Sequence, residues 1–216
     1  MAARKRGAKS VNRAGAAGGA SGGKWEDHLT RRARAENYPA RSVYKLKEIQ
    51  QKFRIIKKGD VVLDLGCAPG SWLLYASNQT GPAGHVFGID IQPVTIDLPA
   101  NVGVIQKDIL EMRDDPLFDP MSGCRVVLSD MAPATTGRKD VDAFRSFELC
   151  RMALETVDRF LLAKGHFVCK IFQGNELSGF EKQVKQRFGE CRVFKPDSCR
   201  KQSREIYLIA RHKRAM

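Results

Sequence analysis

The stretch from Val61 to Gly70 constrains the fold more than any other part of the sequence. Its first half, Val61-Val62-Leu63-Asp64-Leu65, has the length and composition of a strand buried in a parallel sheet. Two glycines and a proline then form a turn, and we expect a helix to begin at Ser71, whose hydroxyl can cap it. A strand, a glycine-rich turn and a helix N-terminus together expose backbone N–H groups where a small ligand can bind.

The spacing within this turn distinguishes between classes of ligand. Gly66 and Gly70 do not form the G-x-G-x-x-G pattern of dinucleotide-binding enzymes, which argues against an NAD-dependent oxidoreductase. The order Asp64-x-Gly66-x-x-x-Gly70 is instead typical of methyltransferases that bind S-adenosylmethionine. On this motif alone, an ordinary strand-to-helix turn of an α/β domain fits equally well.

Length, charge and cysteine pattern narrow the class of protein. The 216 residues suffice for one sizeable α/β domain, and no apolar run is long enough to span a membrane. A net charge of +13 favours a polyanionic partner, RNA or DNA. None of the six cysteines forms a Cys-x-x-Cys pair, so we expect no metal site, no disulfides and a reducing, cytoplasmic location.

The composition predicts a tail followed by a single domain. Residues 1–24 are rich in Gly, Ala, Ser and basic residues, which predicts a disordered basic N-terminal tail, and residues 25–216 then form the domain. The tail also has the arginine-rich, acid-poor composition of an organelle transit peptide. Against this interpretation, Val11 is its only large apolar residue besides the initial Met, so an amphipathic helix is hard to build.

Apolar runs alternate with helical periodicity along the rest of the chain. Two helical pieces separated by Pro39 are expected between residues 25 and 53, with Ser42 as the cap of the second. Further strands are predicted at 85–91, 102–106, 125–129, 167–172, 191–194 and 206–210, with a long helix over 142–162 that Gly165 ends, and a helical pattern over 177–188. This alternation predicts a doubly wound, mostly parallel sheet of seven strands with helices on both faces.

Four acids share one expected position in this sheet. Asp64, Asp90, Asp108 and Asp130 each stand at or near the C-terminal end of a predicted strand, where open α/β sheets bind ligands. Each could instead cap the helix that follows it. Four such acids on four strands favour a ligand site.

Lys170 is the second anomaly, because it lies within the apolar run 166–172. A lysine in a central strand is costly unless it is paired or functional. A buried pair with Glu205, without any chemistry, is the alternative.

Several segments together resemble the FtsJ/RrmJ family of RNA ribose 2′-O-methyltransferases, and the resemblance extends from about residue 25 to residue 210. The matching segments are 41–46, 63–72, 129–133, 168–174, 195–200 and 203–207. The resemblance implies a single-domain, Rossmann-like methyltransferase fold with S-adenosylmethionine as cofactor. The sequence departs from the family pattern at Ser71, where a third glycine is common, and by two residues added between Asp90 and Asp108.

The resemblance also implies roles for individual residues. The family's catalytic Lys-Asp-Lys-Glu set falls on Lys45, Asp130, Lys170 and Glu205. Its cofactor contacts fall on Gly70, Trp72, Asp90, Asp108 and Asp130. In the family, Lys170 is expected to accept the proton of a ribose 2′-hydroxyl, or to stabilise the developing alkoxide electrostatically.

The implied substrate is a uridine in the A-loop of 23S rRNA, with rRNA or the large ribosomal subunit as partner and the enzyme acting as a monomer. Methylation of tRNA or mitochondrial rRNA, a base methyltransferase, and an RNA-binding ribosome assembly factor without activity are the alternatives. Enzymes that methylate exocyclic amines usually carry an aromatic residue after Pro-Pro, and Asp130-Met131-Ala132-Pro133 has none. The basic stretches 1–24, 31–34 and 195–204 are expected to contact RNA phosphates.

Overall fold

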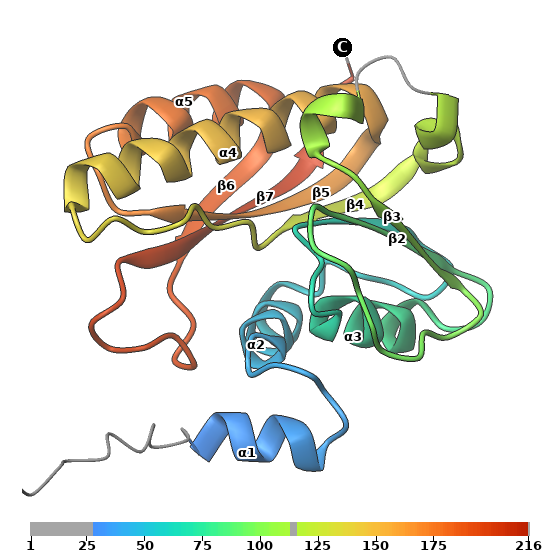
Figure 1. The fold of residues 1–216 in the computed structure, drawn as a ribbon. Helices are drawn as coiled ribbons and strands as arrows, with labels where there is room; N and C mark the ends of the chain where they lie inside the picture. Colours follow the sequence, from blue (N-terminus) through green and yellow to red (C-terminus); the bar gives the residue numbers. More distant parts are fainter. Residues whose placement is uncertain (1–27, 113–115, 216) are drawn as a thin grey trace, which may run out of the picture.

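The computed structural model describes residues 28–112 and 116–215, which are arranged around one central sheet (Figure 1). Helices α4 (Lys139–Phe160) and α5 (Leu177–Arg187) cover one face of this sheet, and α2 (Val43–Phe53) and α3 (Ser71–Thr80) cover the other. The short helix α1 (His28–Ala35) lies beyond α2, away from the sheet. The predicted tail at residues 1–24 lies outside the described residues.

The sheet of the described residues has seven strands in the order β3-β2-β1-β4-β5-β7-β6. The strands are β1 (Val61–Leu65), β2 (His85–Asp90), β3 (Val102–Gln106), β4 (Cys124–Ser129), β5 (Leu161–Phe172), β6 (Phe188–Phe194) and β7 (Glu205–Lys213). The five neighbouring strands β3, β2, β1, β4 and β5 pair in parallel, whereas β7 is antiparallel to both of its neighbours, β5 and β6. The predicted seven-stranded, mostly parallel sheet with helices on both faces is confirmed.

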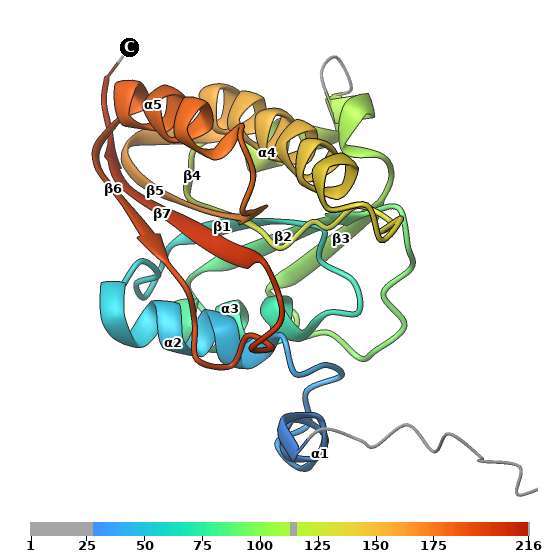
Figure 2. The same cartoon turned by 90° about the vertical axis from the view of Figure 1, so that its left-hand side faces the viewer.

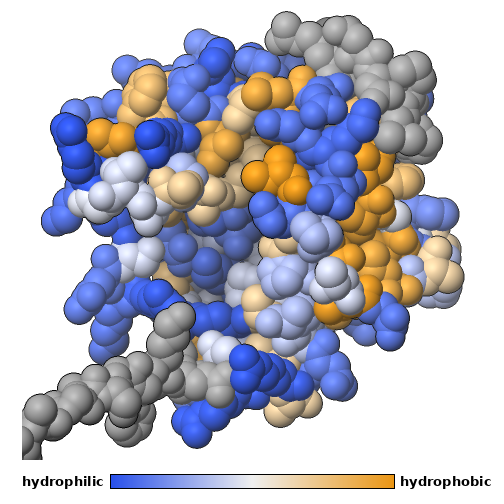
Figure 3. All heavy atoms as spheres, viewed as in Figure 1, coloured by the Kyte–Doolittle hydropathy of each residue, from blue (hydrophilic) through white to orange (hydrophobic). Residues whose placement is uncertain are grey.

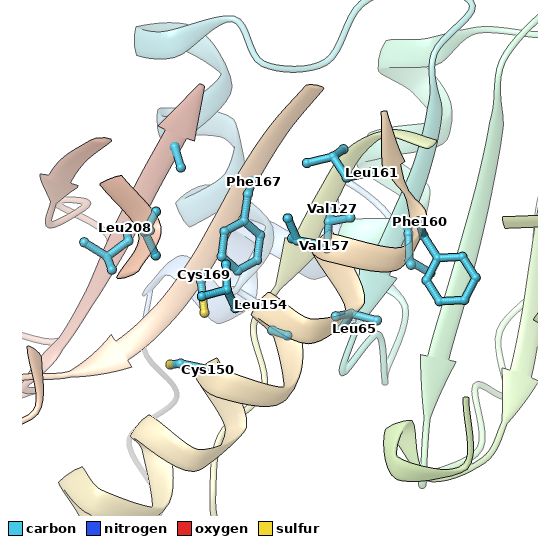
Figure 4. Close-up of a cluster of buried hydrophobic side chains, with 14 of the residues drawn as sticks. Leu65, Val127, Cys150, Leu154, Val157, Phe160, Leu161, Phe167, Cys169 and Leu208 are labelled. Atoms are coloured by element: carbon cyan, nitrogen blue, oxygen red, sulfur yellow. The ribbon is translucent and has the colours of Figure 1, made fainter. Parts of the chain in front are cut away.

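The alternation of side chains along β1 divides the core into two halves. Leu63 and Leu65 point into the cluster beneath α4, whereas Val62 points into the cluster beneath α2 and α3. Figure 4 shows the first cluster, in which Leu65 lies with side chains of α4, β4 and β5. Residues 62–65 of β1 are buried on both faces of the sheet. This burial explains why the strand is apolar except for Asp64.

Two short 3-10 helices connect β3 to β4, namely η1 (Ile109–Met112) and η2 (Pro116–Met121). No helix among the described residues is long and apolar enough to cross a membrane.

The prediction for the long helix and the strand after it was wrong at their junction. Helix α4 begins at Lys139 and ends at Phe160, and β5 follows immediately, so that Gly165 lies inside the strand. A Cβ atom at Gly165 would lie 2.5 Å from Cδ1 of Leu161 and 2.9 Å from the carbonyl oxygen of Arg125. The glycine is therefore needed for close packing against β4, and not for ending the helix.

The predicted helix starts at Ser42 and Ser71 are confirmed, but neither serine makes the expected capping hydrogen bond. Ser42 occupies the N-cap position of α2, but its side chain makes no capping hydrogen bond. At α3 the N-cap residue is Gly70, and Ser71 is the first helical residue. The Ser71 hydroxyl accepts a hydrogen bond from the Ala40 N–H at 2.8 Å and donates one to the Ala40 carbonyl at 3.1 Å. This hydroxyl thus joins α3 to the segment that precedes α2.

Candidate active site

Lys170 and Asp130 meet at the carboxyl edge of the sheet. Asp130 directly follows β4, and Lys170 lies in the neighbouring strand β5 with only 6% of its side chain exposed. The Lys170 Nζ lies 3.1 Å from Oδ1 of Asp130 and also donates a hydrogen bond to the Asp130 backbone carbonyl. These two contacts fix the position of the lysine amine.

Tyr207 is a member of this site that the sequence did not single out. Its hydroxyl donates a hydrogen bond to Oδ1 of Asp130 at 2.6 Å, and the side chain is fully buried. Burial by itself would raise the pKa of Asp130, but the ammonium groups of Lys170 and Lys45 and the Tyr207 hydroxyl outweigh it and lower that pKa. The only sequence signal for Tyr207 was its place two residues after Glu205.

Lys45 and Glu205 complete the predicted catalytic set. The Lys45 Nζ lies 2.9 Å from Oε1 of Glu205, and both side chains are mostly buried, with 12% and 14% exposed. Burial would lower the pKa of Lys45, but the carboxylates of Asp130 and Glu205 outweigh it, so that the pKa is raised. The Lys45 Nζ also lies 6.0 Å from the centre of the Tyr207 ring. Residues from α2, β4, β5 and β7 therefore converge on one cluster.

A cavity of about 700 Å³ opens beside Lys45 and Glu205, and we call it the basic cavity. It is lined by Ala40, Arg41, Ser42, Lys45, Arg200, Lys201, Gln202, Ser203 and Glu205. Its lining comes from the start of α2 and from the loop 195–204 between β6 and β7, which hangs beside α2 (Figures 1 and 2). Figure 3 shows mostly hydrophilic side chains on this part of the surface.

A second cavity, of about 400 Å³, opens beside Asp130, and we call it the acidic cavity. The acids that line it are Asp90, Asp108 and Asp130. Apolar side chains, among them Ile91 and Leu110, form much of the remaining wall. The predicted gathering of strand-end acids thus holds for these three residues.

Asp90 and Asp108 also bind neighbouring backbone N–H groups. Asp90 accepts hydrogen bonds from the N–H groups of Ala68 and Gln92, each at 2.8 Å, and so holds the glycine turn against the end of β2. Asp108 accepts one from Leu110 at 3.0 Å, in the manner of the capping alternative. Both carboxylates still line the cavity, so capping and ligand binding are compatible.

At the positions of the two glycines of the turn, any other residue would be strained. Gly66 has φ +78°, and a Cβ there would lie 2.6 Å from Cγ of Met131. Gly70 has φ +108°, and a Cβ there would lie 2.7 Å from Cδ1 of Ile96. Of the pair, only Gly66 is among the described residues that line the acidic cavity.

Trp72 is buried in α3 and does not belong to the described lining of either cavity. Its indole N–H donates a hydrogen bond to the Ser42 carbonyl at 2.8 Å, and its ring lies 6.0 Å from that of Tyr207. Trp72 therefore contacts both the start of α2 and Tyr207 of β7 and holds these two elements together.

Asp64 differs from the other three acids because it lies completely inside the protein. Its side chain is fully buried within β1, and neither carboxylate oxygen has a hydrogen-bond partner among the described residues. Burial, and secondarily the nearby carboxylates of Asp130 and Asp90, raise the pKa of Asp64 well above its usual range.

In the basic loop 195–204, two cations bind backbone carbonyls and two others line the basic cavity. The Lys195 ammonium donates a hydrogen bond to the Ser203 carbonyl at 2.8 Å, and the Arg204 guanidinium donates to the carbonyls of Lys139 and Gln173. These two cations hold the ends of the loop. Arg200 and Lys201, between them, are exposed and line the basic cavity.

A parallel sheet with a glycine turn after its first strand, and carboxylates at the ends of the next strands, is typical of Rossmann-like enzymes that bind S-adenosylmethionine. The sequence from residue 38 to residue 213 matches the profile of the FtsJ-like methyltransferases, and the chain belongs to this family.

Relatives of known name are similar over most of their length. The "Ribosomal RNA large subunit methyltransferase E" of Desulforapulum autotrophicum is 58% identical over 185 residues, which cover 86% of this chain and 91% of the relative. The protein of the same name from Bdellovibrio bacteriovorus is 45% identical, with 87% and 97% covered. A crystal structure from Plasmodium falciparum, described as a ribosomal RNA methyltransferase, has a TM-score of 0.74 at 28% identity and covers 83% of this chain and 100% of its own.

Proposed function

We propose that this enzyme uses S-adenosylmethionine to methylate the 2′-hydroxyl of one ribose in the rRNA of the large ribosomal subunit, a uridine of the 23S A-loop. One observation carries the proposal: the cluster of Lys45, Asp130, Lys170 and Glu205 borders two cavities, an acidic one through Asp130 and a basic one through Lys45 and Glu205. Such a substrate would place the enzyme in the cytoplasm of a bacterial cell, where large subunits are assembled.

The acidic cavity fits the cofactor in charge and shape. Asp90 and Asp108 offer carboxylate oxygens for the ribose hydroxyls and the adenine amine, respectively, and Asp130 belongs both to this lining and to the ion-pair cluster. Gly66 keeps the floor of the cavity open, since a Cβ there would collide with Met131. When bound, S-adenosylmethionine supplies a methyl group on a positively charged sulfur, which keeps the electron pair of the broken bond. Gly70 and Trp72 contribute by shaping the turn and the helix behind it.

The basic cavity fits an RNA strand. Arg41, Arg200 and Lys201 line it with positive charge, and phosphate groups are the natural partners of such side chains. Lys45 and Glu205 belong to the same lining, so a ribose bound there would reach the cluster. Positioning of the ribose oxygen is the main contribution that such a site can make to a methyl transfer.

The ion pairs of the cluster separate the roles of its two lysines. The raised pKa of Lys45 keeps its ammonium charged near neutral pH, so Lys45 is suited to orient the ribose and to stabilise negative charge. Lys170, held by Asp130 and by its backbone carbonyl, is the candidate to accept the 2′-hydroxyl proton or to stabilise the alkoxide. Tyr207 and Asp130 act as positioning residues for Lys170.

A modified substrate tests the proposal directly. Unmethylated 23S rRNA and large subunits are incubated with the enzyme and labelled S-adenosylmethionine, and the methylated nucleotide is mapped. An RNA with 2′-deoxyribose at that nucleotide should accept no label, whereas 2′-deoxyribose at the next nucleotide should leave labelling intact. Labelling of the deoxy target would place the methyl group on the base and overturn the proposal. Exclusive labelling of tRNA would overturn the substrate assignment alone.

A further inference from the structure

The loop 195–204 is held against α2 by Glu48, one helical turn after Lys45. The Glu48 carboxylate accepts a hydrogen bond from the N–H of Asp197 at 2.6 Å through one oxygen and from the N–H of Ser198 at 2.9 Å through the other. Both bonds are charge-assisted, the stronger kind of hydrogen bond in proteins. Glu48 therefore holds two consecutive backbone amides of a loop 149 positions away in sequence.

Arg41 adds a third contact between the same two segments. Its guanidinium donates a hydrogen bond to the Ser198 carbonyl, so the peptide groups on both sides of Ser198 are held from α2 and from the residues just before it. Ser198 and Cys199 are buried as a result, whereas Arg200 and Lys201 immediately after them are exposed.

This arrangement places the loop cations relative to the catalytic cluster. Lys45 and Glu48 belong to the same helix, and the loop runs directly into β7, which begins with Glu205. Glu205 also has anchors outside the loop, because it pairs with Phe172 in the sheet and forms the ion pair with Lys45, while its N–H donates a hydrogen bond to Oγ of Ser203 within the loop. Loss of the Glu48 contacts would thus free Arg200 and Lys201 while leaving the cluster in place.

We propose that Glu48 is a positioning residue for RNA: it holds the loop 195–204 so that Arg200 and Lys201 bind phosphodiester groups beside the target ribose. This inference rests on the proposed function, because it takes RNA as the occupant of the basic cavity. A carboxylate in a basic RNA-binding region would otherwise oppose binding, and its two amide contacts explain its presence there.

Kinetics of Glu48→Ala and Glu48→Gln test the inference. We expect Glu48→Ala to raise the KM for RNA about tenfold, with kcat within about threefold of wild type and S-adenosylmethionine affinity unchanged. Glu48→Gln keeps one acceptor oxygen and should have an intermediate KM. The control is Glu148→Ala, which removes a partly exposed carboxylate paired with Arg151 on α4. A KM for RNA equal to that of wild type in Glu48→Ala would overturn the inference.

A double-mutant cycle separates positioning from a general loss of stability. If Glu48 acts through the loop cations, Glu48→Ala should raise the KM little further in the Arg200→Ala, Lys201→Ala background. Additive effects would contradict the inference, and if Glu48→Ala does not fold, the cycle is run with Glu48→Gln. RNA affinity is also measured without turnover, by fluorescence anisotropy. A wild-type enzyme that transfers no methyl group to RNA would refute the proposed function, whereas normal transfer with unaltered RNA binding in the variants would refute only the role of Glu48.

Discussion

The acidic and basic cavities both border one ion-pair cluster, and they differ in charge, size and origin. The acidic cavity is formed by the end of β2, by the segments that follow β1, β2, β3 and β4, and by Leu149 and Met152 of α4. The larger basic cavity is formed by the start of α2 and the loop between β6 and β7. The acidic cavity is therefore built mainly at the ends of the parallel strands. The basic cavity is built on α2 and on the loop that joins the two strands at the antiparallel end of the sheet.

Under the proposed function, this difference in charge keeps the two substrates apart. Carboxylates attract a cofactor that carries a positive sulfur and hydrogen-bond donors, and they repel phosphate groups. Arg41, Arg200 and Lys201 do the reverse. The cluster that borders both cavities contains both signs of charge in paired form, so it can face both ligands.

The largest effect is expected from Lys170→Ala, which removes an amine from the ion-pair cluster that borders both cavities. Loss of the amine should reduce kcat at least about 100-fold, the range of a positioned proton acceptor. S-adenosylmethionine should bind as well as before or more tightly, because Asp130 then lacks its lysine partner and attracts a cationic ligand. Single-turnover methyl transfer and calorimetry measure the two quantities.

Two controls sharpen this prediction. Lys170→Arg should also be inactive if the amine accepts a proton, because arginine stays charged in proteins. Activity of Lys170→Ala within tenfold of wild type would exclude a direct role for the amine. A wild-type rate independent of pH between 6 and 9 would leave Lys170 an electrostatic role only.

Asp90→Ala tests the acidic cavity alone. Loss of a hydrogen bond to a charged group should weaken S-adenosylmethionine binding by about 1.5–3 kcal/mol, with RNA affinity unchanged. Calorimetry provides the measurement. The control is Asp97→Ala, which removes an exposed carboxylate in the segment between β2 and β3. Equal affinities for wild type and Asp90→Ala would remove Asp90 from the cofactor site.

The double variant Arg200→Ala, Lys201→Ala tests the basic cavity alone. RNA affinity should fall, and the slope of log K against log salt should decrease by about 0.7 for each lost phosphate contact on single-stranded RNA. S-adenosylmethionine affinity should not change. Lys182→Ala, an exposed lysine on α5 on the opposite face of the sheet, is the control. An unchanged salt slope in the double variant would mean that RNA does not bind in this cavity.

The smallest effect concerns Asp64, beneath the acidic cavity. Its pKa is raised by folding, so the unfolded chain releases this proton at lower pH than the folded one does, and stability is lost as pH rises above about 4. Asp64→Asn removes this cost and should raise the melting temperature without cofactor by a few degrees, corresponding to about 1–2 kcal/mol.

Thermal unfolding of both proteins across pH 5 to 8 checks the sign for Asp64. The advantage of Asp64→Asn should grow with pH until it reaches a plateau. Asp97→Asn, at an exposed position, should unfold like wild type throughout. A lower melting temperature for Asp64→Asn at every pH would show that the buried carboxyl has a partner in solution that stabilises it.

The sequence by itself determined the sheet and the gathering of strand-end acids at its carboxyl edge. The run of apolar residues in β1, the glycine turn after it and the acids at the ends of β2 and β4 are signals carried by neighbouring residues. Such signals are readable because backbone conformation and strand burial depend on local residue type and period. The catalytic set came from the family resemblance, and the structure brings its four members together.

Tertiary structure alone decided which side chains surround that set. Tyr207 reaches Asp130 across the intervening strand β5, Trp72 fastens α2, and Glu48 holds a loop from the far end of the chain. Ser42 and Ser71 were predicted as caps, yet the Ser71 hydroxyl instead joins two segments that are distant in sequence. A side chain chooses its partner after packing has brought remote segments together, and no periodicity or local propensity carries that information.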